Sequence, residues 1–304
     1  MPIRHATLHQ LKIFAAVSRH MSFTRAAEEL HLTPPALSIQ VRQLAEAVGQ
    51  PLFNQIGKKI FLTPAGEALM MACRDVLDRL ERLTQELAAL QGLEKGSLKL
   101  ATLSTAKYFI PRMLGAFCAK HPGVDTALFV GNREELLERL VRNQDDLYIL
   151  GQPPAHINVT AKPFADSALV VVAPPDHPLL LEKDIAPSRL RDVPFILREP
   201  GSGTRLAAEK FFEQHGVSIK TRMEFGSNEA VKQVVVAGFG ITVLSDSTVG
   251  AELARGELAV LDVRGFPLGR KWYVVYPTGK QLTPIASAFL EYLFAGSASG
   301  EGAQ

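Results

Sequence analysis

The sequence predicts an α+β protein of several domains: a winged helix-turn-helix at the N-terminus, one long helix, and a C-terminal α/β domain of two lobes. Three observations predict it. Residues 1–63, here called the head, carry short amphipathic helical patterns and then a hairpin-like pair of apolar runs. Residues 64–92 carry one uninterrupted helical pattern, and residues 93–304 alternate short apolar runs with helical stretches. A chain of 304 residues is long enough for two or three compact units.

Composition and charge fit a globular protein with a basic N-terminus. Apolar residues make up 47% of the chain and charged residues 21%, a mix typical of globular rather than disordered proteins. No stretch approaches twenty consecutive apolar residues, and the first residues do not resemble a secretion signal, which predicts a cytoplasmic protein without membrane contact. The head holds seven basic and three acidic side chains, whereas the net charge of the whole chain is +2. This asymmetry favours a head that binds nucleic acid, although a segment of that charge is often only a solvated face.

The head begins with three helical patterns. Apolar residues between Leu8 and Val17 recur as on one face of a short helix, and Ser22 is a suitable cap for a second helix. Thr33 and Pro34 combine an N-cap with a proline at the first helical position, so a third helix starts there. The apolar residues of the third helix share one stripe, which leaves the opposite face free: Leu37, Val41, Leu44 and Val48.

The free face of the third helix and a basic hairpin tip carry residue types that contact DNA. Residues 52–53 and 60–62 flank Gly57-Lys58-Lys59 as in a short β-hairpin, the wing. In a helix-turn-helix the second helix of the pair enters the major groove, where hydroxyls, apolar groups and basic side chains meet bases and phosphates. A protein-binding role for the three-helix unit is the alternative. The predicted DNA-binding residues are Arg25, Thr33, Pro34, Pro35, Ser38, Ile39, Arg42, Lys58 and Lys59.

Residues 64–92 predict a linker helix that dimerises. Thr63-Pro64 repeats the cap-and-proline start signal, and the helical pattern continues to about Gln91. A surface helix packed on its own domain is the alternative. The apolar positions advance in alternating steps of four and three, which predicts a coiled-coil seam with a second copy of the chain: Leu69, Cys73, Val76, Leu80, Leu83, Leu87 and Leu90.

Residues 93–304 predict a two-lobed α/β domain of the kind found in periplasmic binding proteins. The first series reads as strands and helices in alternation, at 98–103, 109–119, 125–130, 134–141 and 147–150. A second α/β series follows, with apolar runs at 168–173, 195–197, 241–244 and 258–261 and helical stretches near 205–215 and 228–237. A terminal strand and helix at 271–276 and 284–294 are expected to return to the first lobe. We therefore assign lobe I to about 93–163 and 268–295, and lobe II to about 164–267.

Two hydroxyl-rich loops each follow a strand and precede a helix: residues 104–107 in lobe I and residues 200–205 in lobe II. Free backbone N–H groups and the helix dipole favour an anion at such a place, although a bare glycine-rich turn is often only a connector. If the loops face each other across a cleft, they form a site for a small anionic molecule. With neighbouring basic and asparagine side chains, the predicted binding residues are Ser104, Thr105, Lys107, Asn132, Ser202, Gly203, Thr204, Arg205 and Asn228.

Patterns of catalytic or metal-binding residues are missing from the sequence. There is no GxSxG elbow, HExxH helix, cysteine–histidine cluster or dinucleotide fingerprint, so we predict no enzyme activity, no metal and no cofactor. Cys73 and Cys118 have no CxxC partner and are expected to be small buried apolar residues. A periplasmic solute-binding protein is the rival interpretation of residues 93–304, but it would need a signal peptide and no basic head.

Four stretches of the head resemble the N-terminal signature of LysR-type regulators: residues 22–30 (SFTRAAEEL), 32–41 (LTPPALSIQV), 51–53 (PLF) and 62–66 (LTPAG). Two residues depart from that pattern, Pro34 where the family usually has glutamine and Gln55 where it usually has arginine. Four stretches of the C-terminal domain are similar to the CbbR branch of the family, whose members control Calvin-cycle carbon dioxide fixation operons: residues 104–109 (STAKYF), 131–134 (GNRE), 197–205 (LREPGSGTR) and 226–229 (GSNE).

The resemblance implies a transcription regulator with a small-molecule effector. Its implied partners are double-stranded promoter DNA, a second copy in a homodimer or homotetramer, and RNA polymerase. For the CbbR branch the implied effector is a phosphorylated metabolite or a nucleotide cofactor such as NADPH, bound in the cleft of the C-terminal domain. A LysR-type regulator of another metabolic operon, with a different small anionic effector, is the alternative.

Overall fold

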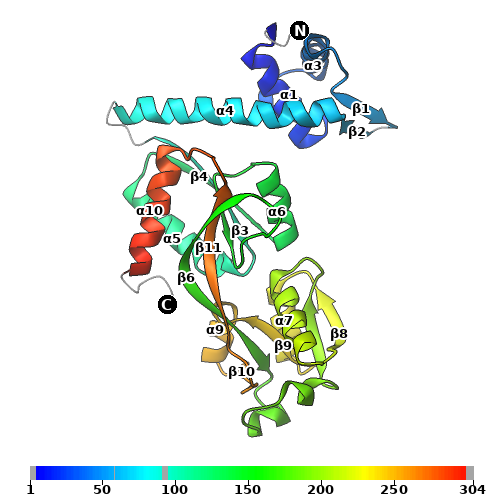
Figure 1. Cartoon of the computed structure of the whole chain (residues 1–304), viewed down its shortest axis with the longest axis vertical. Coiled ribbons are helices and arrows are strands. Elements are labelled where there is room, and N and C mark those ends of the chain that lie inside the picture. The colour runs from blue at the N-terminus through cyan, green and yellow to red at the C-terminus, as the bar shows by residue number, and fades with distance from the viewer. Residues whose placement is uncertain (1–4, 58, 91–94, 299–304) are drawn as a thin grey trace. The chain divides into compact units, whose positions relative to one another are not determined.

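The computed structural model describes residues 5–57, 59–90 and 95–298 (Figure 1). It divides into two compact units, Met1–Leu87 and Ala88–Gln304. Among the described residues, no helix combines the length and the apolar character needed to cross a membrane.

The head contains the three predicted helices and the predicted hairpin. Side chains of Thr7, Ser22 and Thr33 cap the helix N-termini, which explains where each helix begins. Apolar residues of all three helices, including Val17, Ala26 and Leu37, form one core beneath them. The elements are α1 (Leu8–His20), α2 (Phe23–Leu30), α3 (Pro34–Val48), β1 (Phe53–Ile56) and β2 (Lys59–Leu62).

The long helix α4 (Pro64–Leu90) has two parts that differ in burial. Near its start, Leu69, Met70 and Cys73 are buried against α3 and the wing, in a second core of the unit Met1–Leu87. Further along, the predicted seam is exposed, with Leu80 37% and Leu83 47% accessible. Among the seam side chains that the structure describes, only the first two are therefore used by the chain's own core. Val76 and Leu87 are exposed in the same way, and the Leu90 side chain lies outside the described residues.

The second unit is built on one mixed sheet with strand order β10-β6-β11-β5-β3-β4, and β9 also pairs with β6. The strands β3, β4 and β5 run parallel, as the predicted βαβαβ pattern requires, whereas β11 is antiparallel to β5 and β6. The elements of this part are β3 (Gly96–Leu103), η2 (Ala106–Tyr108), α5 (Ile110–Lys120), β4 (Val124–Gly131), α6 (Arg133–Val141), β5 (Leu147–Leu150), β6 (Val159–Ala173), β11 (Leu268–Pro277) and α10 (Pro284–Ala298).

The remaining elements surround the far end of β6. Two 3₁₀ turns, the parallel pair β7–β8 and three helices lie here. Sequence analysis did not predict β8, α9 or the first half of β6, whereas α7, α8 and β9 lie close to their predicted positions. The elements are η3 (Pro178–Leu181), η4 (Pro187–Leu190), β7 (Pro194–Arg198), α7 (Gly203–Gln214), β8 (Lys220–Phe225), α8 (Asn228–Val236), β9 (Thr242–Ser245), α9 (Asp246–Ala254) and β10 (Ala259–Val260).

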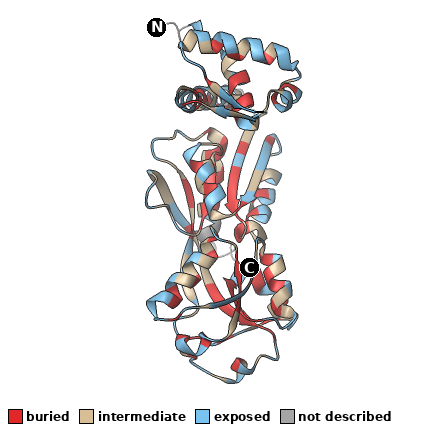
Figure 2. Cartoon of the chain, turned by 90° about the vertical axis from the view of Figure 1, so that its right-hand side faces the viewer, coloured by how far each residue is buried: buried red, intermediate tan, exposed pale blue. Residues whose placement is uncertain are grey.

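Separate apolar cores define the two lobes. One core joins β3, β5 and β11 to α5 and α10, and we call this part lobe I. In lobe II, β6 is buried on both faces: Leu169 and Val171 lie in one core, while Val170 and Val172 lie in another. The buried residues, red in Figure 2, follow these strands. The strands β6 and β11 cross from one lobe to the other as an antiparallel pair, so they hold the two lobes together.

Candidate functional site

The exposed face of α3 presents the residues predicted to contact DNA. Leu37, Val41 and Leu44 are buried in the head, so the helix can turn only its other face outward. Ile39 lies on this outward face and is 45% exposed. The other predicted contacts on and beside this helix are exposed as well: Arg25, Thr33, Pro34, Pro35, Ser38 and Arg42.

The wing places a basic side chain beside a tight turn. Phe53 pairs with Leu62 and Ile56 with Lys59, so β1 and β2 form an antiparallel hairpin with a turn that begins at Gly57. Lys59 is exposed, and Lys58 lies outside the described residues. Gln55, one of the two departures from the LysR pattern, donates a hydrogen bond from Nε2 to the carbonyl oxygen of Gly57 at 3.0 Å. Its side chain therefore bonds to the turn of the wing.

A pocket in the second unit brings the two hydroxyl-rich loops together, one from each lobe. Ser104 follows β3 and forms a backbone hydrogen bond with Gly131 at the end of β4, which fixes the first loop. Ser202 and Thr204, at the start of α7, are 3% and 5% exposed. We call this pocket the anion pocket, and the residues that line it are Leu103, Ser104, Thr105, Asn132, Arg133, Arg198, Ser202, Gly203, Thr204 and Arg270.

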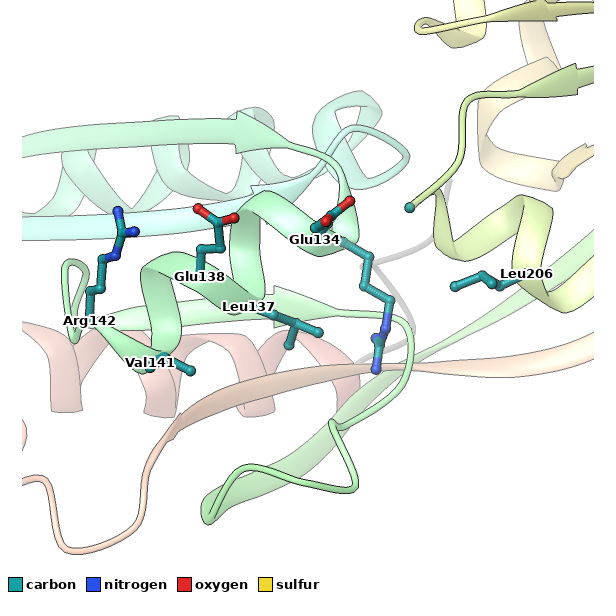
Figure 3. A pocket seen from close by; sticks show the side chains of 8 residues that line it. Glu134, Leu137, Glu138, Val141, Arg142 and Leu206 are labelled. Carbon is teal, nitrogen blue, oxygen red and sulfur yellow. The ribbon is translucent and has the colours of Figure 1, made fainter.

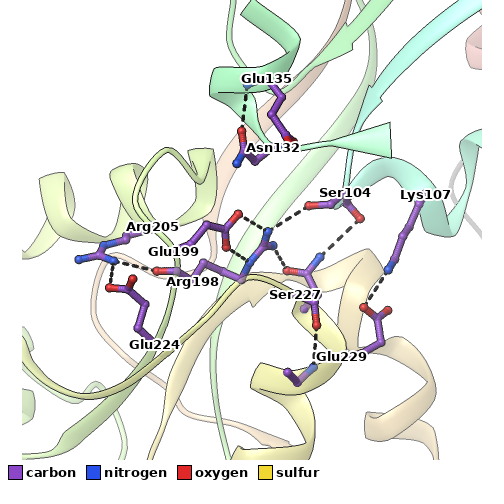
Figure 4. A network of polar contacts seen from close by, with 12 residues as sticks. Ser104, Lys107, Asn132, Glu135, Arg198, Glu199, Arg205, Glu224, Ser227 and Glu229 are labelled. Atoms are coloured by element: carbon purple, nitrogen blue, oxygen red, sulfur yellow. Dashed lines mark hydrogen bonds and ion pairs between the residues drawn. The ribbon is translucent and has the colours of Figure 1, made fainter. Parts of the chain in front are cut away.

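Three of the predicted binding residues do not line the anion pocket. Lys107 donates a hydrogen bond to Glu229 at 2.8 Å. Arg205 bonds to Glu209 at 2.7 Å and also to Glu224. Asn228, which is buried, accepts a hydrogen bond from Arg198. Figure 4 shows Lys107 beside Glu229, Arg205 beside Glu224, and the contacts of Arg198 with residues of both lobes. Asn228 therefore supports the pocket wall, whereas Lys107 and Arg205 are held by carboxylates elsewhere.

Sequence reasoning missed the three arginines of the pocket. Arg133 directly follows the predicted residue Asn132, and Arg198 ends the strand before the glycine-rich loop. Their neighbours in the sequence could therefore have indicated both. Arg270 lies on β11, far along the chain, and no local pattern points to it. Burial lowers the pKa of Arg133 and of Arg270, and the charge of Arg133 lowers the pKa of Arg270 further. The pocket is therefore strongly electropositive.

A wider hollow adjoins the anion pocket and shares Arg133 with it. Figure 3 shows side chains of α6 and of Leu206 on α7 around it. Gly201 has a positive φ of 86°, a conformation that favours glycine, and a Cβ there would lie 2.8 Å from Oε2 of Glu134, so the two lobes approach closely here. The lining includes apolar and charged residues of both signs: Arg133, Glu134, Leu137, Glu138, Val141, Arg142, Gly201 and Leu206.

Two family models match the chain. Residues 8–67 match the bacterial regulatory helix-turn-helix protein, lysR family, and residues 91–297 match the LysR substrate binding domain. The RuBisCO operon transcriptional regulator of Acidithiobacillus ferrooxidans is 80% identical over 301 residues, which cover 99% of this chain and 97% of that protein. The HTH-type transcriptional activator CmpR of Synechocystis sp. is 50% identical, with 96% of each chain covered.

Solved structures share the fold. The regulatory domain of Synechocystis PCC6803 CcmR, in complex with 2-PG, is 49% identical with a TM-score of 0.65, and covers 67% of this chain and 98% of that one. A full-length OxyR of Pseudomonas aeruginosa is 24% identical with a TM-score of 0.76, and covers 96% of this chain and 95% of that one. The chain therefore belongs to the LysR family of bacterial helix-turn-helix transcription regulators.

Proposed function

We propose that this LysR-type regulator controls genes of carbon dioxide fixation, binding promoter DNA through its head and a small phosphorylated metabolite in its anion pocket. The 80% identity to a RuBisCO operon regulator, which extends over 99% of this chain, is the observation that supports these target genes. The matched span covers both α3 and the anion pocket. The proposed activity is a binding function without catalysis, exercised in the cytoplasm.

The DNA-binding part of the proposal rests on the head. The exposed residues Ser38 and Ile39 on α3 suit base edges, and Arg42 and Lys59 suit phosphates. A helix-turn-helix protein binds two half-sites when it is a dimer. The exposed apolar positions of α4, among them Leu80 and Leu83, supply the surface for a second copy. Pairs of dimers and RNA polymerase are further proposed partners.

The effector part of the proposal rests on the anion pocket. Hydroxyls, the N-terminus of α7 and three arginines converge there, and such groups bind phosphate esters. The lining side chains enclose little free space, about 10 Å³, which favours a small metabolite over NADPH. CcmR, whose regulatory domain was solved with 2-PG, is a relevant precedent at 49% identity.

The proposed switch is geometric. The three parts are the head (1–63), the linker and dimerisation helix (64–92) and the effector-binding domain (93–304). An effector that contacts both lobes favours one lobe arrangement over others by its difference in affinity for them. A change in lobe arrangement alters how two C-terminal domains pack in a dimer, and thereby the spacing of the two heads on DNA.

Footprinting on the promoter of the chain's own RuBisCO operon tests the proposed genes, with a shuffled promoter as control. We expect two protected half-sites on the operon promoter and none on the shuffled DNA. A thermal-shift screen of the same protein with 2-phosphoglycolate, phosphoenolpyruvate, Calvin-cycle sugar phosphates and NADPH tests the effector. If the protein protects the promoter of another metabolic operon but not the RuBisCO operon promoter, the alternative LysR-type function is favoured.

A further inference from the structure

The three arginines of the anion pocket differ in how their charge is balanced. Arg198 is paired with Glu199 through two contacts, Nε to Oε2 at 2.8 Å and Nη2 to Oε1 at 2.9 Å. Its guanidinium also donates to Ser104 Oγ at 3.2 Å and to Asn228. Arg198 thus ties the loop of lobe II to the loop of lobe I, and it brings little net charge to the pocket.

Arg133 and Arg270 keep their charge unbalanced. Among the residues that the structure describes, neither forms an ion pair, and Arg133 Nη1 donates to the backbone oxygen of Gln152 at 2.6 Å. Both side chains are half-buried, and the charge of Arg133 lowers the pKa of Arg270. Two like charges in such a place are unfavourable until an anion binds between them.

The turn after β5 is shaped around this arginine pair. A Cβ at Gly151 would lie 2.7 Å from Nη2 of Arg270, so the absence of a side chain leaves room for that guanidinium. The next residue, Gln152, supplies the carbonyl oxygen that holds Arg133. Two successive residues of one turn therefore position both arginines, which come from α6 and β11.

The opposite wall of the pocket belongs to lobe II. A Cβ at Gly203 would lie 3.7 Å from Cδ of Arg133, so the start of α7 approaches the arginine pair closely. The side chain of Ser202 makes no capping hydrogen bond to α7, and the first N–H groups of a helix have no partners within it. Ser202, Gly203 and Thr204 line the pocket, so the start of α7 brings hydroxyl and backbone N–H donors to this wall.

We propose that Arg133 and Arg270 form a charge-reading pair that selects effectors with a dianionic phosphate monoester, and that the phosphate bridges this pair to the N-terminus of α7. A dianion balances both guanidiniums, whereas a single carboxylate balances only one. Guanidinium groups also match the oxygens of a phosphate in bidentate fashion. The inference rests on the proposed function, because it takes the anion pocket as the effector site.

Calorimetric titration of the full chain with 2-phosphoglycolate between pH 5 and 7.5, in phosphate-free buffer, tests the pair. The second proton of a phosphate monoester leaves near pH 6, so the affinity of the wild type should rise across this range. Arg270→Gln and Arg133→Gln should each weaken binding about tenfold or more and flatten this rise. Arg270→Lys keeps a charge and should keep the rise. Arg112 is an exposed arginine of lobe I outside the pocket, so Arg112→Gln should change neither the affinity nor its rise with pH.

Ligand-free melting of the same variants separates charge reading from damage to the fold. Because Arg270→Gln removes one of two repelling charges, its melting temperature should equal or exceed that of the wild type. Unchanged affinity and pH dependence in both glutamine variants would overturn the charge-reading pair alone. If the wild type binds neither 2-phosphoglycolate nor the sugar phosphates while it still protects its promoter, the effector part of the proposed function fails, and the pair fails with it.

Discussion

The ammonium of Lys107 lies 2.8 Å from a carboxylate oxygen of Glu229, so a residue of lobe I is bonded to a residue of lobe II beside the anion pocket. The hydroxyl of Tyr108 donates to the other oxygen of Glu229 at 2.5 Å. Burial alone would raise the pKa of Glu229, but the hydrogen bonds from Lys107 and Tyr108 outweigh it and lower the pKa to about 2. The contact therefore needs an ionised Glu229.

The first prediction is a pH-dependent stability that depends on Glu229. Because the folded state lowers the pKa from 4.5 to about 2, the contribution is complete above pH 4.5 and is lost as the pH falls toward 2. The side chain is 47% exposed, so solvent screening limits the contribution to about 1 kcal/mol. Glu229→Gln should be less stable than the wild type at pH 7, and this gap should close in acid.

Urea titrations of the full chain, followed by the fluorescence of its single tryptophan, measure this gap. Trp272 is buried in the core of lobe I, so its emission reports unfolding of that lobe. Glu213→Gln, at an exposed glutamate of lobe II, is the matched control and should show no such gap at either pH. A gap for Glu229→Gln that stays constant from pH 7 to 3 would contradict the prediction.

The second prediction concerns the seam of α4. Leu80→Glu combined with Leu83→Glu should convert the proposed dimer to monomers, because an unpaired charge in a desolvated coiled-coil core costs several kcal/mol. Light scattering gives the assembly state and footprinting gives the number of protected half-sites. Leu80→Met combined with Leu83→Met keeps the seam apolar and should keep the dimer. Intact two-half-site protection by the glutamate variant would exclude the seam as a dimer contact.

The third prediction separates phosphate contacts from base contacts. Lys59→Ala should weaken binding to operator and random DNA alike, and should reduce the slope of log affinity against log salt by about one. Ser38→Ala or Ile39→Ala should weaken operator binding selectively, by about 1–3 kcal/mol. Titrations of both DNAs at several salt concentrations distinguish the two effects. A salt slope unchanged by Lys59→Ala would mean that the wing does not contact the DNA backbone.

Local signals were sufficient to predict most elements. The cap-and-proline signals at Thr33 and Thr63 mark the starts of α3 and α4, because capping depends on residues next to each other in sequence. The elements that were missed have weak local patterns. The strand β8 is rich in charged residues and pairs with β7 only, and α9 carries Gly250 in its interior.

The anion pocket was only partly predictable, because some of its residues are brought together by contacts between elements far apart in the sequence. Hydroxyl-rich loops after strands are local features, and Ser104 and Thr204 do meet in one pocket. The direction of a long side chain depends on partners from other elements. Lys107 bonds to Glu229, 122 positions away, and nothing near Arg270 in the sequence indicates that β11 brings it to the same pocket.

The last prediction compares two glycines in helices. Gly66 lies in the first turn of α4, where a Cβ would collide with the backbone oxygen of Leu52, which cannot rotate away. Gly66→Ala should therefore destabilise the head by roughly 1–3 kcal/mol, as overpacked sites do. Gly115, exposed within α5, has no atom within 4 Å of an added Cβ, so Gly115→Ala should stabilise lobe I by about 0.5–1 kcal/mol through helix propensity.

Hydrogen exchange read peptide by peptide measures each change locally, without requiring the whole chain to unfold in one step. Exchange should accelerate at the start of α4 in the first variant and slow in α5 in the second. Equal effects of the two substitutions would show that the close approach of Leu52 to α4 does not constrain the head.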